Sequence, residues 1–492
     1  MGFPTGKKEI VLAVGLLISG MVLVNSFIFG GLNLGVALGL CLGILCSFFY
    51  ALSQKQRIRS YPIALTALSL AIGASFARGD DTPVKALLLA TVLVVFNLAL
   101  CLLAGKNQRN PGTALSLLDG IGTFFRGFGG IGDACIGIGR TLRTSRSFSA
   151  KSRSVLLGIG IALPLVIILV PLLMTADAAF EGLMDQLPSI SFKQILLTVV
   201  LGGGFALLLY AKSVALKHRV LPQQLPSLPR GLSSLTVNTV LMAVCGVYLV
   251  YLVSQLAYFS GGFSGILPEE YTLAEYARRG FFEMAWLCGL NLSIIVGALW
   301  VCVKKDPAPR LTRCLCLFLG VMTLFLVCAA SAKMLLYIDS FGLTRLRVLT
   351  QVAMVFLGLT TVFVCLWLFL PKLPYMKCVV LTALLLAALV SWADVDTLVA
   401  RYNTENYLSG KTETVDVYYL EDLGDGAVPY LDRLYRESPD ANIRDAAYYV
   451  LCNWRVNTYG DLRSWNYASG LAEDYLADYA PESAFAIDFE LH

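Results

Sequence analysis

Charged residues of both signs gather where one long apolar stretch begins in the second half of the chain. Glu275, Arg279 and Glu283 are spaced four residues apart, so a helix would stack them along one face, with the arginine between two carboxylates. Glu283 already lies inside the apolar stretch, where a charged side chain has to face protein or water. This pattern suits either a polar pocket at the edge of a membrane or an ion-pair lock between helices.

The following apolar stretch offers a partner for Glu283. Lys333 precedes Asp339 by six residues, so on a helix it lies roughly 9 Å deeper. A lysine side chain can extend from that depth toward the membrane surface. A contact between Glu283 and Lys333 is therefore predicted.

The turn after Asp339 adds two arginines. Gly342 suits a left-handed helix end, and Thr344 suits the N-cap of the next helix. Arg345 and Arg347 need acidic partners, for which Asp339 and Glu275 are the candidates. The candidate polar cluster, structural or functional, comprises Glu275, Arg278, Arg279, Glu283, Lys333, Asp339, Arg345 and Arg347.

Long apolar segments position these residues. The chain has 492 residues, of which 57% are hydrophobic and 14% charged, which is too apolar for an ordinary soluble protein. Apolar blocks of roughly 18–27 residues can cross a ~30 Å hydrocarbon core as helices. We predict an all-α integral membrane protein, a bundle of about eleven transmembrane helices. The blocks cover about 10–30, 33–52, 61–78, 84–104, 154–175, 194–215, 234–259, 281–303, 311–338, 346–370 and 377–397.

Polar residues are rare inside these blocks. Asn97, Asn238 and Asn291 are isolated amides, which favours hydrogen bonds between helices over ligand binding. The run 202–204 is three glycines, which could form an unwound site or, as we favour, a closely packed face.

Basic residues predict the orientation in the membrane. Alternate connections hold most of the 38 lysines and arginines, including the stretches 106–153 and 212–230, which begin with Lys106 and Lys212. By the positive-inside rule these connections and the N-terminus are cytoplasmic, and the C-terminus is extracytoplasmic. Residues 394–492 hold 19 acidic and 7 basic residues, which suits an acidic region outside.

The chain divides into four predicted segments: four N-terminal transmembrane helices (1–110), a cytoplasmic amphipathic segment (111–153), a seven-helix transmembrane core (154–398) and a small acidic extracytoplasmic helical module (399–492). Amphipathic patterns predict three helices in this module, near 428–435, 443–451 and 471–476.

Apolar residues recur every three or four positions through 111–150, from Leu115 to Leu142, among glycines and arginines. This favours a helix, broken by its glycines, that lies on anionic inner-leaflet lipids. Packing against the bundle from below is the alternative.

The scarcity of histidine and the lack of a P-loop argue against several kinds of catalytic and binding site. Only His218 and His492 are histidines, so a histidine-rich metal site, a serine–histidine triad and a histidine proton relay are not expected. No phosphate-binding glycine loop of the P-loop type occurs. No catalytic, metal-binding or cofactor-binding residue and no cofactor is predicted.

Three motifs occur in one order: E-Y-A-R-R-G-F-F-E (275–283), Y-I-D-S-F-G-L-T-R-L-R (337–347) and A-R-Y-N-T-E-N-Y-L-S-G-K-T-E-T-V-D-V-Y-Y-L followed by L-G-D-G-A-V-P-Y-L (400–431). With Trp465-Asn466, they resemble a family of bacterial multi-pass membrane proteins known only as a domain of unknown function. The resemblance covers roughly residues 150–470. It implies a bacterial cytoplasmic membrane and supplies no activity.

Three function classes follow. The first is a non-enzymatic envelope protein that senses, scaffolds or regulates, with an envelope protein partner for the C-terminal module. The second is a transporter or lipid flippase that uses the polar cluster at the outer leaflet. The third is a membrane-embedded transferase that relies on carboxylates alone. Nucleic acid is not expected as a partner, because the basic residues follow membrane topology.

Overall fold

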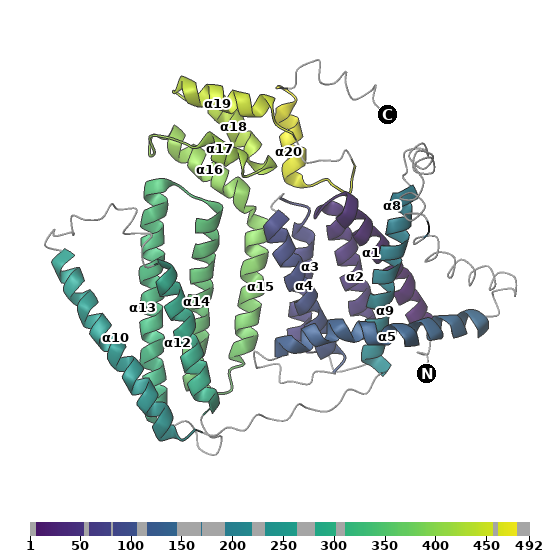
Figure 1. Cartoon of the computed structure of the whole chain (residues 1–492), viewed down its shortest axis with the longest axis horizontal. Helices are drawn as coiled ribbons and strands as arrows, with labels where there is room; N and C mark the ends of the chain where they lie inside the picture. The colour runs from purple at the N-terminus through teal and green to yellow at the C-terminus, as the bar shows by residue number, and fades with distance from the viewer. Residues whose placement is uncertain are drawn as a thin grey trace. The chain divides into compact units, whose positions relative to one another are not determined.

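The structure is a computed structural model, and helices account for its regular architecture (Figure 1). It describes residues 6–53, 59–79, 82–105, 116–144, 169, 192–218, 232–262, 281–301, 310–455 and 461–479. The chain forms two compact units. Unit 1 comprises residues 1–224, 387–396 and 417–492, and unit 2 comprises residues 225–386 and 397–416.

Eight described helices are long and apolar enough to cross a membrane. They cover Lys7–Phe29, Leu34–Leu52, Pro83–Leu103, Gln194–Leu216, Ser234–Val253, Arg310–Phe341, Arg345–Phe369 and Tyr375–Ala393. Two shorter apolar helices, Ser60–Ser75 and Glu283–Leu299, match two more predicted spans. The span predicted at 154–175 lies outside the described residues. The all-α multi-pass membrane fold is confirmed, and the count of eleven stays a prediction.

In unit 1, α1 (Lys7–Phe29) and α2 (Leu34–Leu52) form a tight hairpin. A Cβ added at Gly39 of α2 would lie 2.7 Å from the backbone nitrogen of Leu23 on α1, so only glycine allows this approach. The Ser19 hydroxyl donates to the Gly39 carbonyl at 2.7 Å and fixes the same contact. Helices α3 (Ser60–Ser75) and α4 (Thr82–Leu103) complete this group.

A short helix, α8 (Phe192–Leu197), leads into a π-helical turn, η2 (Thr198–Gly202), and then α9 (Gly203–His218). A Cβ at Gly202 would lie 2.9 Å from the Cα of Met21, and one at Gly20 would lie 2.5 Å from the Gly202 carbonyl. Gly202 therefore packs backbone to backbone on α1, as the sequence favoured. Gly203 and Gly204 have open space around them.

Helix α5 (Leu117–Thr144) is continuous and runs across the ends of the unit 1 helices (Figure 1). The prediction that glycines break this helix is wrong. Gly120 instead allows close packing, because a Cβ there would lie 2.5 Å from the Val94 carbonyl of α4. Ala134 is fully buried in a cluster with Leu16 of α1. The opposite face stays exposed and apolar, with Leu118, Ile121, Phe125, Phe128 and Ile136. The helix thus packs on the bundle with small residues and leaves its large apolar stripe uncovered.

In unit 2, buried polar bonds join helices α10 (Ser234–Gly262), α12 (Phe281–Val301) and α13 (Arg310–Phe341), and α14 (Arg345–Phe369) packs against α13. Asn291 accepts from the Tyr248 hydroxyl at 2.8 Å and donates to Thr323 at 3.1 Å. Thr312 donates to Asn238 at 2.6 Å. The predicted role of Asn238 and Asn291 is confirmed. Helices α15 (Tyr375–Ala393) and α16 (Val395–Leu408) follow.

The C-terminal part of unit 1 contains α17 (Val417–Glu421), the short 3₁₀ helix η3 (Asp425–Ala427), α18 (Val428–Glu437), α19 (Ala441–Cys452) and α20 (Tyr467–Leu476). The last three are the helices predicted from amphipathic patterns, and Leu431, Leu434, Val450 and Ala472 form their buried faces. Residues 417–479 pack with the N-terminal helices, whereas 397–416 belong to unit 2. The structural division thus falls near 416.

Candidate functional site

The structure describes five of the eight residues in the predicted polar cluster. Glu275, Arg278 and Arg279 lie outside the described residues. Glu283 is exposed in the first turn of α12, and Lys333 is half-buried on α13. The Glu283–Lys333 contact stays a prediction. A carboxylate in the first turn of a helix is also favoured by the helix dipole.

Asp339 has a different partner from the arginines expected for it. Lys411, which follows α16, donates to Asp339 at 2.6 Å, and the side chains are 49% and 65% exposed. The hydrogen bond that Lys411 donates to this carboxylate raises the pKa of Lys411 above its ordinary value. Water screens a pair this exposed, so it is weak.

Arg347 caps the end of α13. Its guanidinium donates to the carbonyl of Phe341 at 2.9 Å and to that of Gly342, and it lies 4.2 Å from the centre of the Tyr337 ring. Thr344 accepts from the Arg347 amide and Gly342 has a φ of 75°, as predicted for this turn. Carbonyls at a helix C-terminus carry partial negative charge, which explains why Arg347 takes them in place of an acidic side chain. Arg345 is half-buried beside it.

A second group of polar residues lies in unit 1, where residues 461–470 contact the α1–α2 and α3–α4 connections. We call these contacts the docking site. Backbone bonds of 2.9–3.1 Å join the two sides: the amides of Leu34 and Gly35 donate to the carbonyls of Trp465 and Arg463, and those of Tyr467 and Ala468 donate to Ala77 and Arg78. Amides in the first turn of a helix have no partner inside that helix. The docking site therefore caps the start of α2 with the segment before α20, and the start of α20 with the segment after α3.

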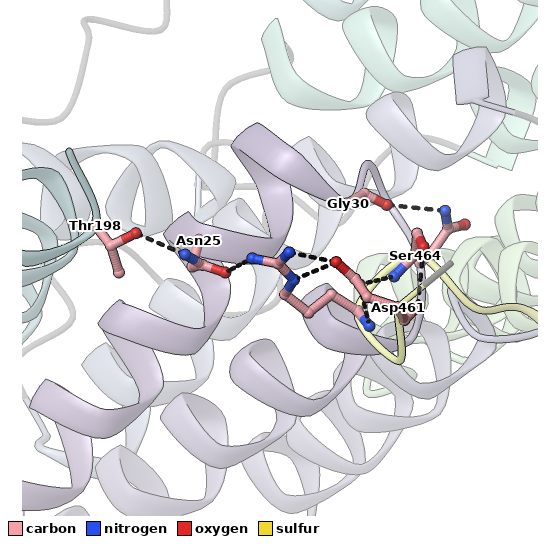
Figure 2. A network of polar contacts seen from close by, with 7 residues as sticks. Asn25, Gly30, Thr198, Asp461 and Ser464 are labelled. Atoms are coloured by element: carbon pink, nitrogen blue, oxygen red, sulfur yellow. Dashed lines mark hydrogen bonds and ion pairs between the residues drawn. The ribbon is translucent and has the colours of Figure 1, made fainter. Parts of the chain in front are cut away.

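Arg463 links the docking site to two further helices (Figure 2). Its Nε donates to Asp461 at 2.8 Å, and its Nη1 donates to the Asn25 side chain of α1 at 2.5 Å. Asn25 in turn donates to the Thr198 hydroxyl of η2 at 2.7 Å. A Cβ at Gly30 would lie 3.0 Å from the Cβ of Arg463, so glycine leaves room for this side chain. One arginine therefore connects the C-terminal segment, α1 and the π-helical turn.

A buried polar chain lies beneath this arginine. Lys85 of α4 donates to Asn33 at 2.9 Å, and Asn466 donates to the same oxygen at 3.4 Å. Asn466 also donates to Ser469, whose hydroxyl donates to Asp425 at 2.6 Å. All five side chains are buried, so a buried ammonium and a buried carboxylate are connected through three neutral groups. Burial strengthens each of these bonds and makes the loss of any one costly.

Charge stabilises the docked form. The Arg463 guanidinium and two backbone amides hold the pKa of Asp461 below its usual value. Arg78 lies 5.8 Å from the centre of the Tyr467 ring, a cation–π contact across the site. These contacts hold and orient the C-terminal segment. The one hydroxyl–carboxylate pair in the buried polar chain, Ser469 and Asp425, is closed off from solvent, so the arrangement suits recognition between parts of the chain better than a reaction.

Sequence reasoning missed this site. No local pattern singles out Lys85, Asn25, Asn33 or Arg463. Asn25 and Asn33 stand at the end of one span and before the next, a polar position that could have drawn attention. Their partners lie more than 400 residues away, and nothing in a local pattern indicates such a distance.

Comparison with known proteins gives one match. The family model described as "Domain of unknown function (DUF4153)" matches residues 11–434. No curated protein and no solved structure matches the chain. The match begins in α1, so the first four spans are part of the family region, where the motif resemblance had begun near residue 150. The chain belongs to the DUF4153 family of proteins that carry a domain of unknown function.

Proposed function

We propose that the protein is a non-enzymatic regulator of the bacterial cell envelope, in which the C-terminal helices act on the N-terminal transmembrane helices through the docking site. The observation that carries this proposal is the set of bonds from residues 461–470 to α1, to the start of α2 and to the α3–α4 connection. They tie a segment with large exposed apolar side chains, Leu462 and Tyr467, to the ends of membrane helices. A protein partner bound to this segment would change the same bonds.

Topology supports the proposal. With the N-terminus cytoplasmic, the α1–α2 and α3–α4 connections and the C-terminal segment are all predicted outside, and these three segments are in contact. Such an arrangement places the docking site on the extracytoplasmic face of the cytoplasmic membrane, where an envelope protein partner can reach it.

Helix α5, on the side predicted to be cytoplasmic, has a surface suited to contact with lipid. The exposed apolar stripe of α5, with Phe125 and Phe128 at its centre, is wide enough to enter the inner leaflet. The sequence of this segment is rich in arginine, a composition that suits anionic head groups. In this arrangement α5 anchors the bundle to inner-leaflet lipids while the docking site responds on the other side.

The test compares two arginines of the C-terminal part in the full-length protein. Arg463→Ala removes the bonds to Asn25 and Asp461, whereas Arg433→Ala removes only an exposed pair with Glu437. Hydrogen exchange at Leu34 and Gly35 reports docking directly, because these amides donate to the docked segment. We expect faster exchange and loss of complementation of a deletion strain for Arg463→Ala only.

The proposal fails if Arg463→Ala loses docking and still complements fully. The flippase alternative is tested with the wild-type protein in vesicles that contain a fluorescent lipid, quenched from outside. We expect the same protected fraction as in protein-free vesicles. Loss of the protected fraction would favour the flippase and overturn a purely regulatory role.

A further inference from the structure

Lys212 lies inside unit 1. Although it begins the basic stretch 212–230, it lies within the predicted span 194–215, and the apolar helix continues past it to Leu216. Its side chain is 2% exposed. Its ammonium lies 6.0 Å from the centre of the Phe96 ring and forms no hydrogen bond or ion pair with the part of the chain that the structure describes. Buried ammonium groups in proteins are normally paired, because an isolated charge is costly away from water.

A cavity of about 30 Å³ adjoins this lysine between α1, α2, α4 and α9. Two further polar groups with unused hydrogen-bonding capacity line it. Asn97 donates to the Leu93 carbonyl of its own helix, and its Oδ1 is buried without a partner. The role predicted for Asn97, a bond between helices, is therefore wrong within the described residues. The Ser47 hydroxyl is also buried and forms no hydrogen bond there.

The composition of the wall limits the ligand. One positive charge and one free hydroxyl favour a ligand with a single negative charge and oxygen acceptors. A volume of this size holds about two waters, or a group as small as a carboxylate. The rest of the wall is apolar, including Leu40, Val92 and Phe205, which suits hydrocarbon next to the charge.

We propose that this cavity is a carboxylate-binding site, in which the Lys212 ammonium and the Ser47 hydroxyl donate to the carboxylate oxygens. The carboxylate belongs either to a small free acid or to the end of a fatty acid whose chain lies among the apolar side chains. The site is separate from the docking site, and its existence does not depend on the regulatory function proposed above.

The first experiment measures thermal unfolding of the purified full-length protein in a neutral detergent, with acetate, laurate and dodecanol as probes. A fatty acid site predicts that laurate raises the Tm, whereas acetate and dodecanol do not. A site for small acids predicts that acetate raises it as well. If dodecanol equals laurate, or if neither acid raises the Tm, the proposal is overturned.

The variants Lys212→Met and Lys372→Met separate the site from general charge effects. Lys372 is exposed between α14 and α15, so its loss should leave the response to laurate unchanged. Lys212→Met should weaken the apparent Kd for laurate at least tenfold. An undiminished response in Lys212→Met would overturn the proposal.

A second measurement needs no variant and decides the case if Lys212→Met does not fold. Native mass spectrometry of the wild-type protein should retain laurate in a one-to-one complex and should not retain methyl laurate, which has the same chain without the charge. Equal retention of the acid and the ester, or no retention of either, would contradict a carboxylate site.

Discussion

The docking site of unit 1 and the α13–α14 turn of unit 2 both place charged residues at helix ends, yet they use them differently. At the docking site, Arg463 bonds to a carboxylate and an amide that come from opposite ends of the sequence. At the turn, Arg347 bonds to carbonyls five and six residues away, and Asp339 forms an exposed pair with Lys411. Charged side chains thus join remote segments in unit 1, whereas in unit 2 they cap the end of a helix or pair on the exposed surface.

This difference predicts where substitutions act at a distance. The bonds from residues 461–470 to the N-terminal helices close long loops of chain, so their loss frees a whole segment. At the turn, the Arg347 bonds restrain only a few residues, and the Asp339–Lys411 pair joins remote residues but is exposed, so water can replace it. The predictions below test this contrast, beginning with the largest expected effect.

Asp425→Ala should have the largest effect. Its two oxygens accept from Trp454 at 3.0 Å and from Ser469 at 2.6 Å, and the side chain is 1% exposed. Loss of two buried bonds to a carboxylate should cost about 3–5 kcal/mol in the free energy of unfolding of unit 1. Chemical unfolding monitored by tryptophan fluorescence measures it. Asp445→Ala, at an exposed position of α19, is the control and should stay within ~0.5 kcal/mol of wild type.

The substitutions Gly39→Ala and Gly246→Ala compare helix packing in unit 1 with helix packing in unit 2. In unit 1 the new Cβ would lie within 2.8 Å of three Leu23 atoms, two of them backbone, so α1 and α2 must separate at a cost of about 1–3 kcal/mol. Gly246→Ala on α10 of unit 2 meets open space and should be neutral or slightly stabilising, since alanine favours a helix. Equal Tm values for the two variants would show that α1 and α2 are not packed this closely.

The docking site should weaken in acid. Because Arg463 lowers the pKa of Asp461, the ionised form stabilises the docked segment above the ordinary value of 3.8, and this contribution disappears as the pH falls through the lower value. Both side chains are about one-third exposed, so the effect should remain under ~1 kcal/mol. The Tm difference between wild type and Asp461→Asn should be present at pH 7 and shrink as the pH falls below 3.8. A constant difference would exclude this carboxylate as the cause.

Local patterns predicted the spans, the α13–α14 turn and the helices α18, α19 and α20, because each depends on residues a few positions apart. The Thr344 cap and the Gly342 conformation are examples. The docking site and the cavity beside Lys212 could not be predicted in this way, since their residues come from four or more separated segments. Lys212 begins a basic stretch in the sequence, and only the fold shows that the helix buries it.

The α13–α14 turn should give the smallest effect. Lys411→Met removes an exposed pair, and water can hydrate Asp339 in its place, so the Tm of the full-length protein should not change measurably. Arg347→Met should lower it slightly more, because the carbonyls of Phe341 and Gly342 lose their donor and the Tyr337 ring loses its cation. Thermal unfolding of both variants at low and moderate salt tests the order. If Lys411→Met proves as damaging as Arg463→Ala, exposed charges hold unit 2 together as firmly as the docking site holds unit 1, and the contrast between the two regions is lost.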